Sequence, residues 1–201
     1  MQPAKLNYKI YQGATFEEVY RWESETKVYV PVQTISKSAP CVITTTAAHN
    51  LPVGWRFRVV GVGGMKEINS VGEDAYYLIT QAPSATTIEI NQTNSLGYTA
   101  YTSGGVVEYN QPVPLIGYQA RMQIRETVDS PTVIYSAVSD VLNAHLFVDD
   151  TAKTIQVRIP AEVTQTFEFA TAVYSIELFV PDGSVVSFVG GNLTLVPEVT
   201  R

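Results

Sequence analysis

Residues 118–125 read Tyr-Gln-Ala-Arg-Met-Gln-Ile-Arg and alternate strictly between apolar and polar side chains. Successive side chains of a β-strand point to opposite faces, so this alternation predicts a strand with one face in a core and one in water. The same period of two recurs in residues 6–10, 154–159 and 172–180. Two further strand candidates of similar length lie at residues 27–32 and 133–138. The chain holds 27 Val and 21 Thr against 10 Leu, which favours the pleated surface of sheets. We therefore predict an all-β protein.

The middle of the chain is richer in glycine and has shorter strand patterns than the two ends. Most of the 13 glycines fall within residues 36–109, where short strand patterns are separated by Gly-, Asn- and Ser-containing turns. The longer strand patterns lie before residue 35 and after residue 115. This distribution predicts an outer β-sandwich formed by residues 1–35 and 110–201, interrupted by a small inserted β-barrel at 36–109. A domain inserted into a loop needs neighbouring ends, so residues 35 and 110 are expected to lie close together.

Charge and composition argue against several classes of partner. The formal net charge of −6 leaves no basic surface for a nucleic-acid backbone, so we expect no direct nucleic-acid partner. One Cys and two His exclude an intrachain disulfide and are too few for an ordinary structural zinc site. No apolar stretch approaches the roughly 20 residues of a membrane span, and the first eight residues lack a secretory pattern. We expect no metal, no cofactor and no membrane association.

Four segments of the middle region carry a resemblance to a known module: Val42–Thr45, His49–Gly54, Val60–Asn69 and Tyr98–Gly105. Their order over about 65 residues resembles a module of phage tail and baseplate proteins, which is similar to the small β-barrel of the first catalytic-cysteine half-domain of ubiquitin-activating enzymes. Asn50 stands where the phage copies commonly have Gly. A half-domain resemblance implies no ubiquitin chemistry, so Cys41 is not interpreted as a thioester cysteine.

The outer segments resemble phage virion proteins through residues 117–125, 174–178 and 181–183 and the terminal 197–201. This pattern is similar to the immunoglobulin-like N-terminal domain of baseplate upper proteins. The two resemblances together imply an immunoglobulin-like sandwich with an inserted small β-barrel. They also imply a structural protein of a tailed-phage virion, made in the bacterial host cytoplasm and placed in the neck, tail, baseplate or fibre-attachment region. The partners implied are other virion proteins and copies of the same chain in a symmetric assembly.

The residues that could carry chemistry have simpler structural interpretations. His49 lies in a turn pattern, and His145 has no nucleophile motif beside it. On a strand, Glu17-Glu18 point to opposite faces, and Asp149-Asp150 is a turn pattern without EF-hand spacing. Gly61–Gly64 lacks the Lys and following helix of a phosphate-binding loop and is interpreted as a hairpin loop. We therefore predict no catalytic residues and no enzyme activity.

Aromatic residues are the candidates for protein–protein contact, because aromatic anchors dominate the energy of interfaces. The preferred anchors are Tyr8, Tyr11, Tyr20, Trp22 and Trp55. Two alternative functions stay open. A capsid decoration protein would differ in copy number, with hundreds of copies per particle. A host-carbohydrate-binding module would use aromatic residues of the insert, namely Tyr76, Tyr77, Tyr98, Tyr101 and Tyr109.

Overall fold

The computed structural model describes residues 2–142 and 144–198 of the chain. Its elements are strands, apart from the one-turn helices η1 (Lys66–Ile68) and α1 (Ala161–Thr164), so the predicted all-β class is confirmed. The chain divides into two compact units. The terminal unit comprises Met1–Arg21 and Pro114–Arg201, and the central unit comprises Trp22–Val113.

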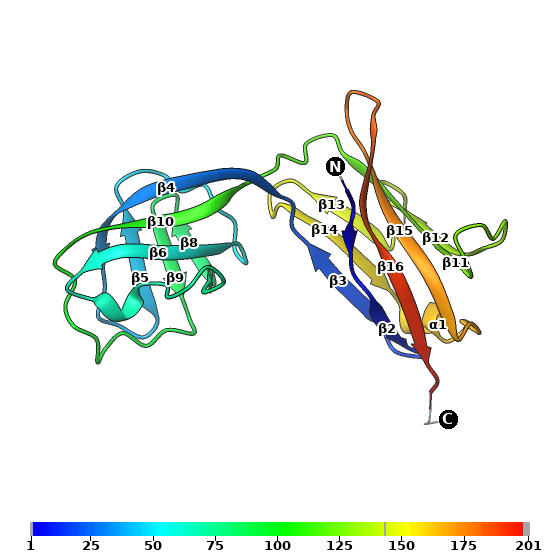
Figure 1. Cartoon of the computed structure of the whole chain (residues 1–201), viewed down its shortest axis with the longest axis horizontal. Helices are drawn as coiled ribbons and strands as arrows, with labels where there is room; N and C mark the ends of the chain where they lie inside the picture. Colours follow the sequence, from blue (N-terminus) through cyan, green and yellow to red (C-terminus); the bar gives the residue numbers. More distant parts are fainter. Residues whose placement is uncertain (1, 143, 199–201) are drawn as a thin grey trace. The chain divides into compact units, whose positions relative to one another are not determined.

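The terminal unit contains two sheets, in which strands from both ends of the chain meet (Figure 1). The six-stranded sheet runs β1-β16-β15-β11-β12, with β2 also paired to β16; its strands are β1 (Ala4–Lys5), β2 (Tyr8–Tyr11), β11 (Gln119–Arg125), β12 (Val133–Val138), β15 (Thr171–Phe179) and β16 (Val185–Val196). The three-stranded sheet runs β13-β14-β3; its strands are β3 (Phe16–Tyr20), β13 (Leu146–Asp149) and β14 (Thr154–Ile159).

The alternation read from the sequence places the core of the terminal unit as expected. Met122 of β11 pairs with Ile176 of β15, and Ile124 pairs with Tyr174. All four of these side chains are buried, and so is Leu178. Tyr174, Ile176 and Leu178 therefore form the buried face of the alternation predicted for residues 172–180.

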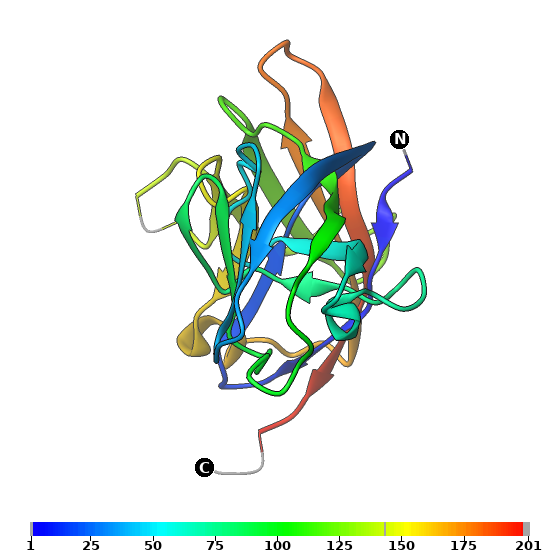
Figure 2. The same cartoon turned by 90° about the vertical axis from the view of Figure 1, so that its left-hand side faces the viewer.

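The first strands of the chain pair in parallel with its last strand. Residues 4–5 pair with 189–190, and residues 8–11 pair with 193–196, so β1 and β2 extend one edge of the sheet along β16 (Figure 2). Between them the backbone turns in towards Gly191, where an added Cβ would lie 1.9 Å from the Leu6 carbonyl oxygen. The Asn7 side chain accepts a hydrogen bond from the Asn192 backbone N–H at 2.9 Å. Only glycine allows this approach of the two backbones.

The central unit is one seven-stranded sheet with the order β7-β6-β10-β4-β5-β9-β8, which has half-barrel features. Its strands are β4 (Glu23–Ile35), β5 (Cys41–Thr45), β6 (Arg56–Gly63), β7 (Tyr77–Leu78), β8 (Gln81–Ser84), β9 (Thr87–Ile90) and β10 (Ser103–Pro112). The long strands β4 and β10 lie side by side in both views (Figures 1 and 2). The fully buried Trp55, Phe57, Ile43 and Met65 belong to its single core. The resemblance segments of the middle region all belong to this unit.

The unit boundaries differ from those expected at residues 35/36 and 109/110. The structure groups residues 22–35 with the middle of the chain, because β4 pairs along its length with β10 and with β5. Val30 and Val32 of β4 are buried in the core of the central unit. The ends of the unit are neighbours, since the Val113 N–H donates to the Trp22 carbonyl at 3.0 Å. The expected closeness of the two ends thus occurs at residues 22 and 113.

Candidate functional site

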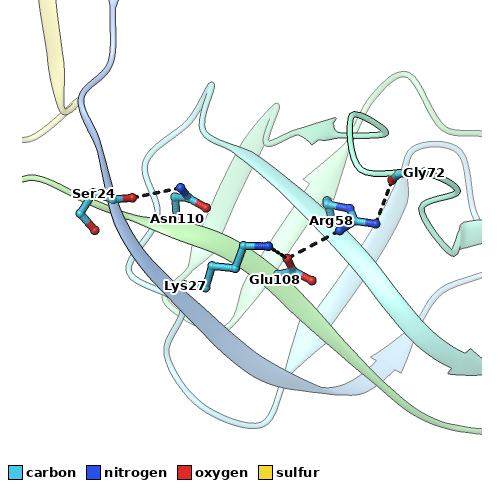
Figure 3. Close-up of polar contacts among 6 residues, drawn as sticks. All are labelled: Ser24, Lys27, Arg58, Gly72, Glu108 and Asn110. Carbon is cyan, nitrogen blue, oxygen red and sulfur yellow. Dashed lines mark hydrogen bonds and ion pairs between the residues drawn. The ribbon is translucent and has the colours of Figure 1, made fainter. Parts of the chain in front are cut away.

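A buried carboxylate lies at the middle of the central unit's sheet. Glu108 of β10 is 9% exposed, although it lies on the opposite face from the buried Val107 and Tyr109. Lys27 Nζ of β4 donates to Glu108 Oε1 at 2.6 Å, and Arg58 Nη1 of β6 lies 3.6 Å from the same oxygen (Figure 3). This hydrogen bond raises the pKa of Lys27. One carboxylate thereby links three neighbouring strands across the face of the sheet.

The loop between η1 and β7 contacts Arg58, the second cation beside this carboxylate. Arg58 Nη2 donates to the Gly72 carbonyl oxygen at 2.8 Å, which ties the loop to the sheet (Figure 3). Gly72 has a φ of 89°, a left-handed conformation that glycine adopts without steric cost. On the same strand, Arg56 donates two hydrogen bonds to Glu23, at 2.7 and 2.8 Å. The Arg56 guanidinium also lies 4.5 Å from the centre of the Tyr76 ring, within the range of a cation–π contact.

Exposed apolar side chains surround these fixed charges. Tyr29 pairs with Glu108, which pairs with Arg58, so the three side chains share one face. Tyr29 is 56% exposed, while Leu78, which pairs with Arg56, is 46% exposed. We define the central-unit outer face by the residues Tyr29, Arg56, Arg58, Tyr76, Leu78 and Glu108. Sequence reasoning missed this face, because its residues come from four strands whose register no local pattern reveals. The one available signal was Tyr29, an aromatic residue flanked by the valines of a strand pattern.

The structure places the five predicted anchors very differently. Trp55 is fully buried, and its indole N–H donates to the Asn110 carbonyl at 3.1 Å. Tyr20 is 8% exposed and packs edge-on against Phe188. These two residues are core residues, so their selection as surface anchors is corrected here. Trp22 is half-buried and so is Tyr8, which contacts the rings of Phe16 and Tyr174; Tyr11 is exposed.

His49 holds a turn of the central unit. It is 2% exposed, and its Nδ1 accepts the backbone N–H of Leu51 at 3.0 Å. The Tyr109 hydroxyl donates to the His49 carbonyl oxygen at 2.8 Å. Burial lowers the pKa of His49, which therefore stays neutral. This geometry agrees with the structural role expected from the turn pattern.

His145 lies in the terminal unit beside Tyr135 of β12. The Tyr135 hydroxyl and His145 Nδ1 are 2.7 Å apart, and the two rings are stacked with an angle of 7° between their planes. Burial raises the pKa of Tyr135 to about 12, so the hydroxyl keeps its proton at neutral pH. The imidazole is therefore held in one orientation by a neutral partner.

The paired carboxylates have separate partners. Glu17 is exposed and accepts a hydrogen bond from Gln156, whereas Glu18 on the other face is half-buried, and desolvation raises its pKa. Asp149 accepts the backbone N–H groups of residues 151 and 152, as expected for a turn. Asp150 instead accepts from the Leu115 N–H at 2.6 Å and from the Lys153 side chain. Glu17, Asp149 and Asp150 thus each make a structural contact, while Glu18 lies on the opposite face of β3 from Glu17.

The tyrosines proposed for sugar binding mostly serve the half-barrel. Tyr77 donates to the Ile68 carbonyl at 3.0 Å, and Tyr101 donates to the Gly104 carbonyl at 3.0 Å. Tyr98 packs against the core, and Tyr109 is buried within it. Of these five residues, Tyr76 alone is among the exposed ones. They do not form the shared aromatic platform that the carbohydrate alternative requires.

The interpretation of Gly61–Gly64 as a hairpin loop is wrong, because residues 61–63 are the end of β6, where Val62 and Gly63 pair with β10, and only Gly64 lies in the link to η1. Asn69 holds this end of β6 by accepting the Val62 N–H at 2.8 Å and donating to the Val62 carbonyl at 3.0 Å. Within residues 2–142 and 144–198, no three His, Cys, Asp or Glu side chains gather as metal ligands would. No helix in the described part of the chain is long and apolar enough to span a membrane.

Comparison with known proteins found no protein-family model that matches this chain and no matching curated protein.

Proposed function

We propose that this chain is a non-enzymatic structural component of a tailed-phage virion, acting by protein–protein contact in the neck, tail, baseplate or fibre-attachment region. The finer architecture that accompanies this proposal is an immunoglobulin-like sandwich for the terminal unit and an inserted small β-barrel for the central unit. The resemblances described above support the proposal. In addition, the segments that resemble the phage module fall within one unit and contribute to one core.

The observation that carries the proposal is the central-unit outer face. Exposed Tyr29, Tyr76 and Leu78 surround charged groups that are already fixed by ion pairs and hydrogen bonds. A rigid surface loses little conformational entropy when it binds, and tyrosines supply large contact areas at low entropic cost. The face therefore offers exposed aromatic and apolar anchors beside arginines that are already held in place, and aromatic residues and arginine are the residue types enriched at interfaces.

The test uses phage particles that carry variants of this chain. Tyr29→Ala combined with Leu78→Ala is expected to lower incorporation into purified virions by tenfold or more, since loss of interface anchors costs about 2 kcal/mol or more. Val128→Ala, which removes an 80% exposed side chain from the terminal unit, is the control and should be incorporated normally. Quantitative mass spectrometry of the particles gives the readout.

The same measurement separates the proposal from its alternatives. A few dozen copies per wild-type particle, in multiples of three or six, agree with a tail or neck position, whereas hundreds of copies indicate a capsid decoration protein. Absence of the wild-type chain from purified particles contradicts the proposal outright. Normal incorporation of the double variant would mean that assembly uses another surface, such as the one that contains Tyr11.

A further inference from the structure

The terminal unit contains a hollow beside Phe147 that the assembly proposal does not use. The hollow has a volume of about 330 Å³ and is lined by Phe147 of β13, Arg158 of β14, Glu162 of α1 and, outside these elements, Thr15, Ala144, His145 and Pro160. A second hollow of about 510 Å³ shares Ala144 and Phe147 with it. Both volumes are in the range of sites for small molecules. Phe147 thus stands between two adjoining hollows.

Phe147 offers an exposed ring on a rigid strand. It pairs with Gln156 of β14 and is 42% exposed, whereas the preceding Leu146 is fully buried. The alternation of the strand therefore turns the Phe147 ring outward. The C–H face of a pyranose ring is apolar and flat, and stacking it on such a ring removes both surfaces from water.

The polar groups of the hollow are mixed in kind and balanced in charge. Arg158 can only donate hydrogen bonds, Glu162 as a carboxylate can only accept them, and Thr15 can do both. The positive charge of Arg158 has two carboxylates near it, because Glu162 lines the same hollow and Glu17 Oε2 lies 3.9 Å from Arg158 Nε. The lining thus mixes both signs of charge and presents no field of a single sign that would select a small ion. Sugar hydroxyls, which are neutral and both donate and accept, suit this lining.

The imidazole of His145 is positioned before any ligand arrives. Tyr135 can donate its hydroxyl proton to Nδ1 over the 2.7 Å contact, which leaves the ring proton on Nε2 as the donor available to a ligand. The Arg158 N–H also donates to the His145 carbonyl at 2.8 Å, which fixes the backbone on that side of the hollow. A donor held in this way adds affinity without an ordering cost.

We propose that this hollow binds a neutral saccharide, with Phe147 as the stacking platform and His145, Arg158 and Glu162 as hydrogen-bonding groups. The adjoining hollow on the other side of Phe147 gives room for further sugar residues, so an oligosaccharide is the preferred ligand. The site belongs to the terminal unit and uses none of the residues of the central-unit outer face. A negative result for saccharide binding would therefore leave the assembly proposal unchanged, and the reverse also holds.

Saturation-transfer NMR on the intact chain tests the proposal, with glucose, galactose, mannose, N-acetylglucosamine, maltotriose and chitotriose as probes. At least one of these sugars is expected to receive saturation, and a trisaccharide that binds should do so more tightly than its monosaccharide. Backbone amide shifts on titration are expected at residues 144–147 and 158–162. No saturation transfer to any of the six probes, or shifts confined to other residues, overturns the proposal.

Matched variants locate the binding. Phe147→Ala and Arg158→Gln are each expected to weaken binding about tenfold, because the first removes one stacking contact and the second removes one charged hydrogen bond. Val19→Ala removes an exposed apolar side chain from the same sheet face, and Arg121→Gln removes an exposed guanidinium that pairs with Glu177. Both controls should bind as wild type. Controls that weaken binding as much as the two test variants, with all four variants melting like wild type, contradict the site.

Discussion

The two units use their charged residues in different ways. In the terminal unit, the pair formed by Arg121 and Glu177 lies on the surface, with 44% and 33% of the two side chains exposed. In the central unit, the Glu108 side chain is only 11% exposed, while its partner Arg58 is 17% exposed. A surface pair contributes little to stability, whereas a buried carboxylate requires its partners. The exposed pair thus contributes little to the sheet of the terminal unit, whereas the sheet of the central unit requires the partners of Glu108.

The two units also differ in the distance along the chain over which their strands pair. Every strand of the central unit lies within residues 22–113, whereas the terminal unit pairs residues 4–11 with residues 189–196. The central unit is therefore self-contained in sequence, while the terminal unit depends on both ends of the chain.

The largest effect is expected from excising the central unit. Removing residues 22–113 and joining Arg21 to Pro114 with a short Gly-Ser linker should leave a folded terminal unit, since the cut follows the unit boundary. Removing only residues 37–108 should instead cause aggregation, because it leaves β4 without β5 and most of β10 and exposes Val30 and Val32. Circular dichroism and calorimetric melting distinguish the two products. Equal, cooperative melting of both would show that the boundary lies near residue 36.

A charge placed in the terminal core should unfold that unit alone. Ile176 is fully buried, so Ile176→Asp is expected to cost several kcal/mol, comparable with the roughly 5–15 kcal/mol of a whole domain. Both tryptophans, Trp22 and Trp55, belong to the central unit, so tryptophan fluorescence reports on that unit only. The variant should lose part of its β-type circular dichroism and keep the wild-type fluorescence melting curve. Simultaneous loss of both signals would mean that the two units unfold together.

Neutralising Glu108 should have an intermediate effect. Glu108→Gln leaves Arg58 without its anionic partner and is expected to cost about 2 kcal/mol in the stability of the central unit. The matched control in the terminal unit is Glu177→Gln, which breaks an exposed pair and should cost less than about 1 kcal/mol. Chemical denaturation followed by tryptophan fluorescence measures the first and circular dichroism the second. A smaller loss for Glu108→Gln than for Glu177→Gln would reverse the comparison.

The smallest effects are expected from pH, with opposite signs in the two units. Because burial lowers the pKa of His49, the unfolded chain binds the proton more readily, and the stability present above about pH 6.5 falls as pH drops below that value. His49→Asn, whose amide oxygen can replace Nδ1 as acceptor, should remove this dependence from the central unit. Fluorescence melting between pH 5 and 8, roughly the range in which histidine titrates, gives the measurement. An unchanged pH dependence would assign it to other groups.

Glu18 gives the opposite sign in the terminal unit. Desolvation raises its pKa, so the folded state favours the protonated carboxyl, and stability falls as pH rises from about 4.3 through the raised value. Glu18→Gln is expected to raise the melting temperature at pH 7 slightly and to change it little at pH 4. Calorimetry at the two pH values tests this, with the exposed Glu17→Gln as control. A stabilisation of equal size at both pH values would exclude ionisation as its cause.

Local patterns predicted the strands well where alternation was strong. Residues 133–138 and 154–159 are strands β12 and β14 with the predicted bounds, and the alternation at 172–180 corresponds to β15 (Thr171–Phe179). Strand β4 was predicted only for residues 27–32, although it spans Glu23–Ile35. Its first residues are polar and its Pro31 weakens the local signal, so the length of β4 depends on pairing with β10, which is remote in sequence. The domain boundary was misplaced for the same reason.

The candidate surfaces were less predictable than the fold. An aromatic residue suits a core as well as an interface, and only tertiary packing separates the buried Trp55 from the exposed Tyr29. The contacts of Glu108 with Lys27 and Arg58 depend on the register of three strands. The hollow at Phe147 depends on residues as far apart in the sequence as Thr15 and Glu162. Side-chain type indicates what a residue could do, while long-range pairing decides where it lies.

The pairing of residues 4–11 with β16 has a consequence for biosynthesis. While the ribosome makes the chain, the central unit has all its strands once residue 113 has emerged, but β1 and β2 wait unpaired until β16 is made. We therefore expect a finished half-barrel on a nascent chain whose first strands are still exposed. Those strands carry Lys5 and Lys9 between their apolar residues, and charges in such positions oppose aggregation of unpaired strands. The two lysines would then protect the protein before it is complete.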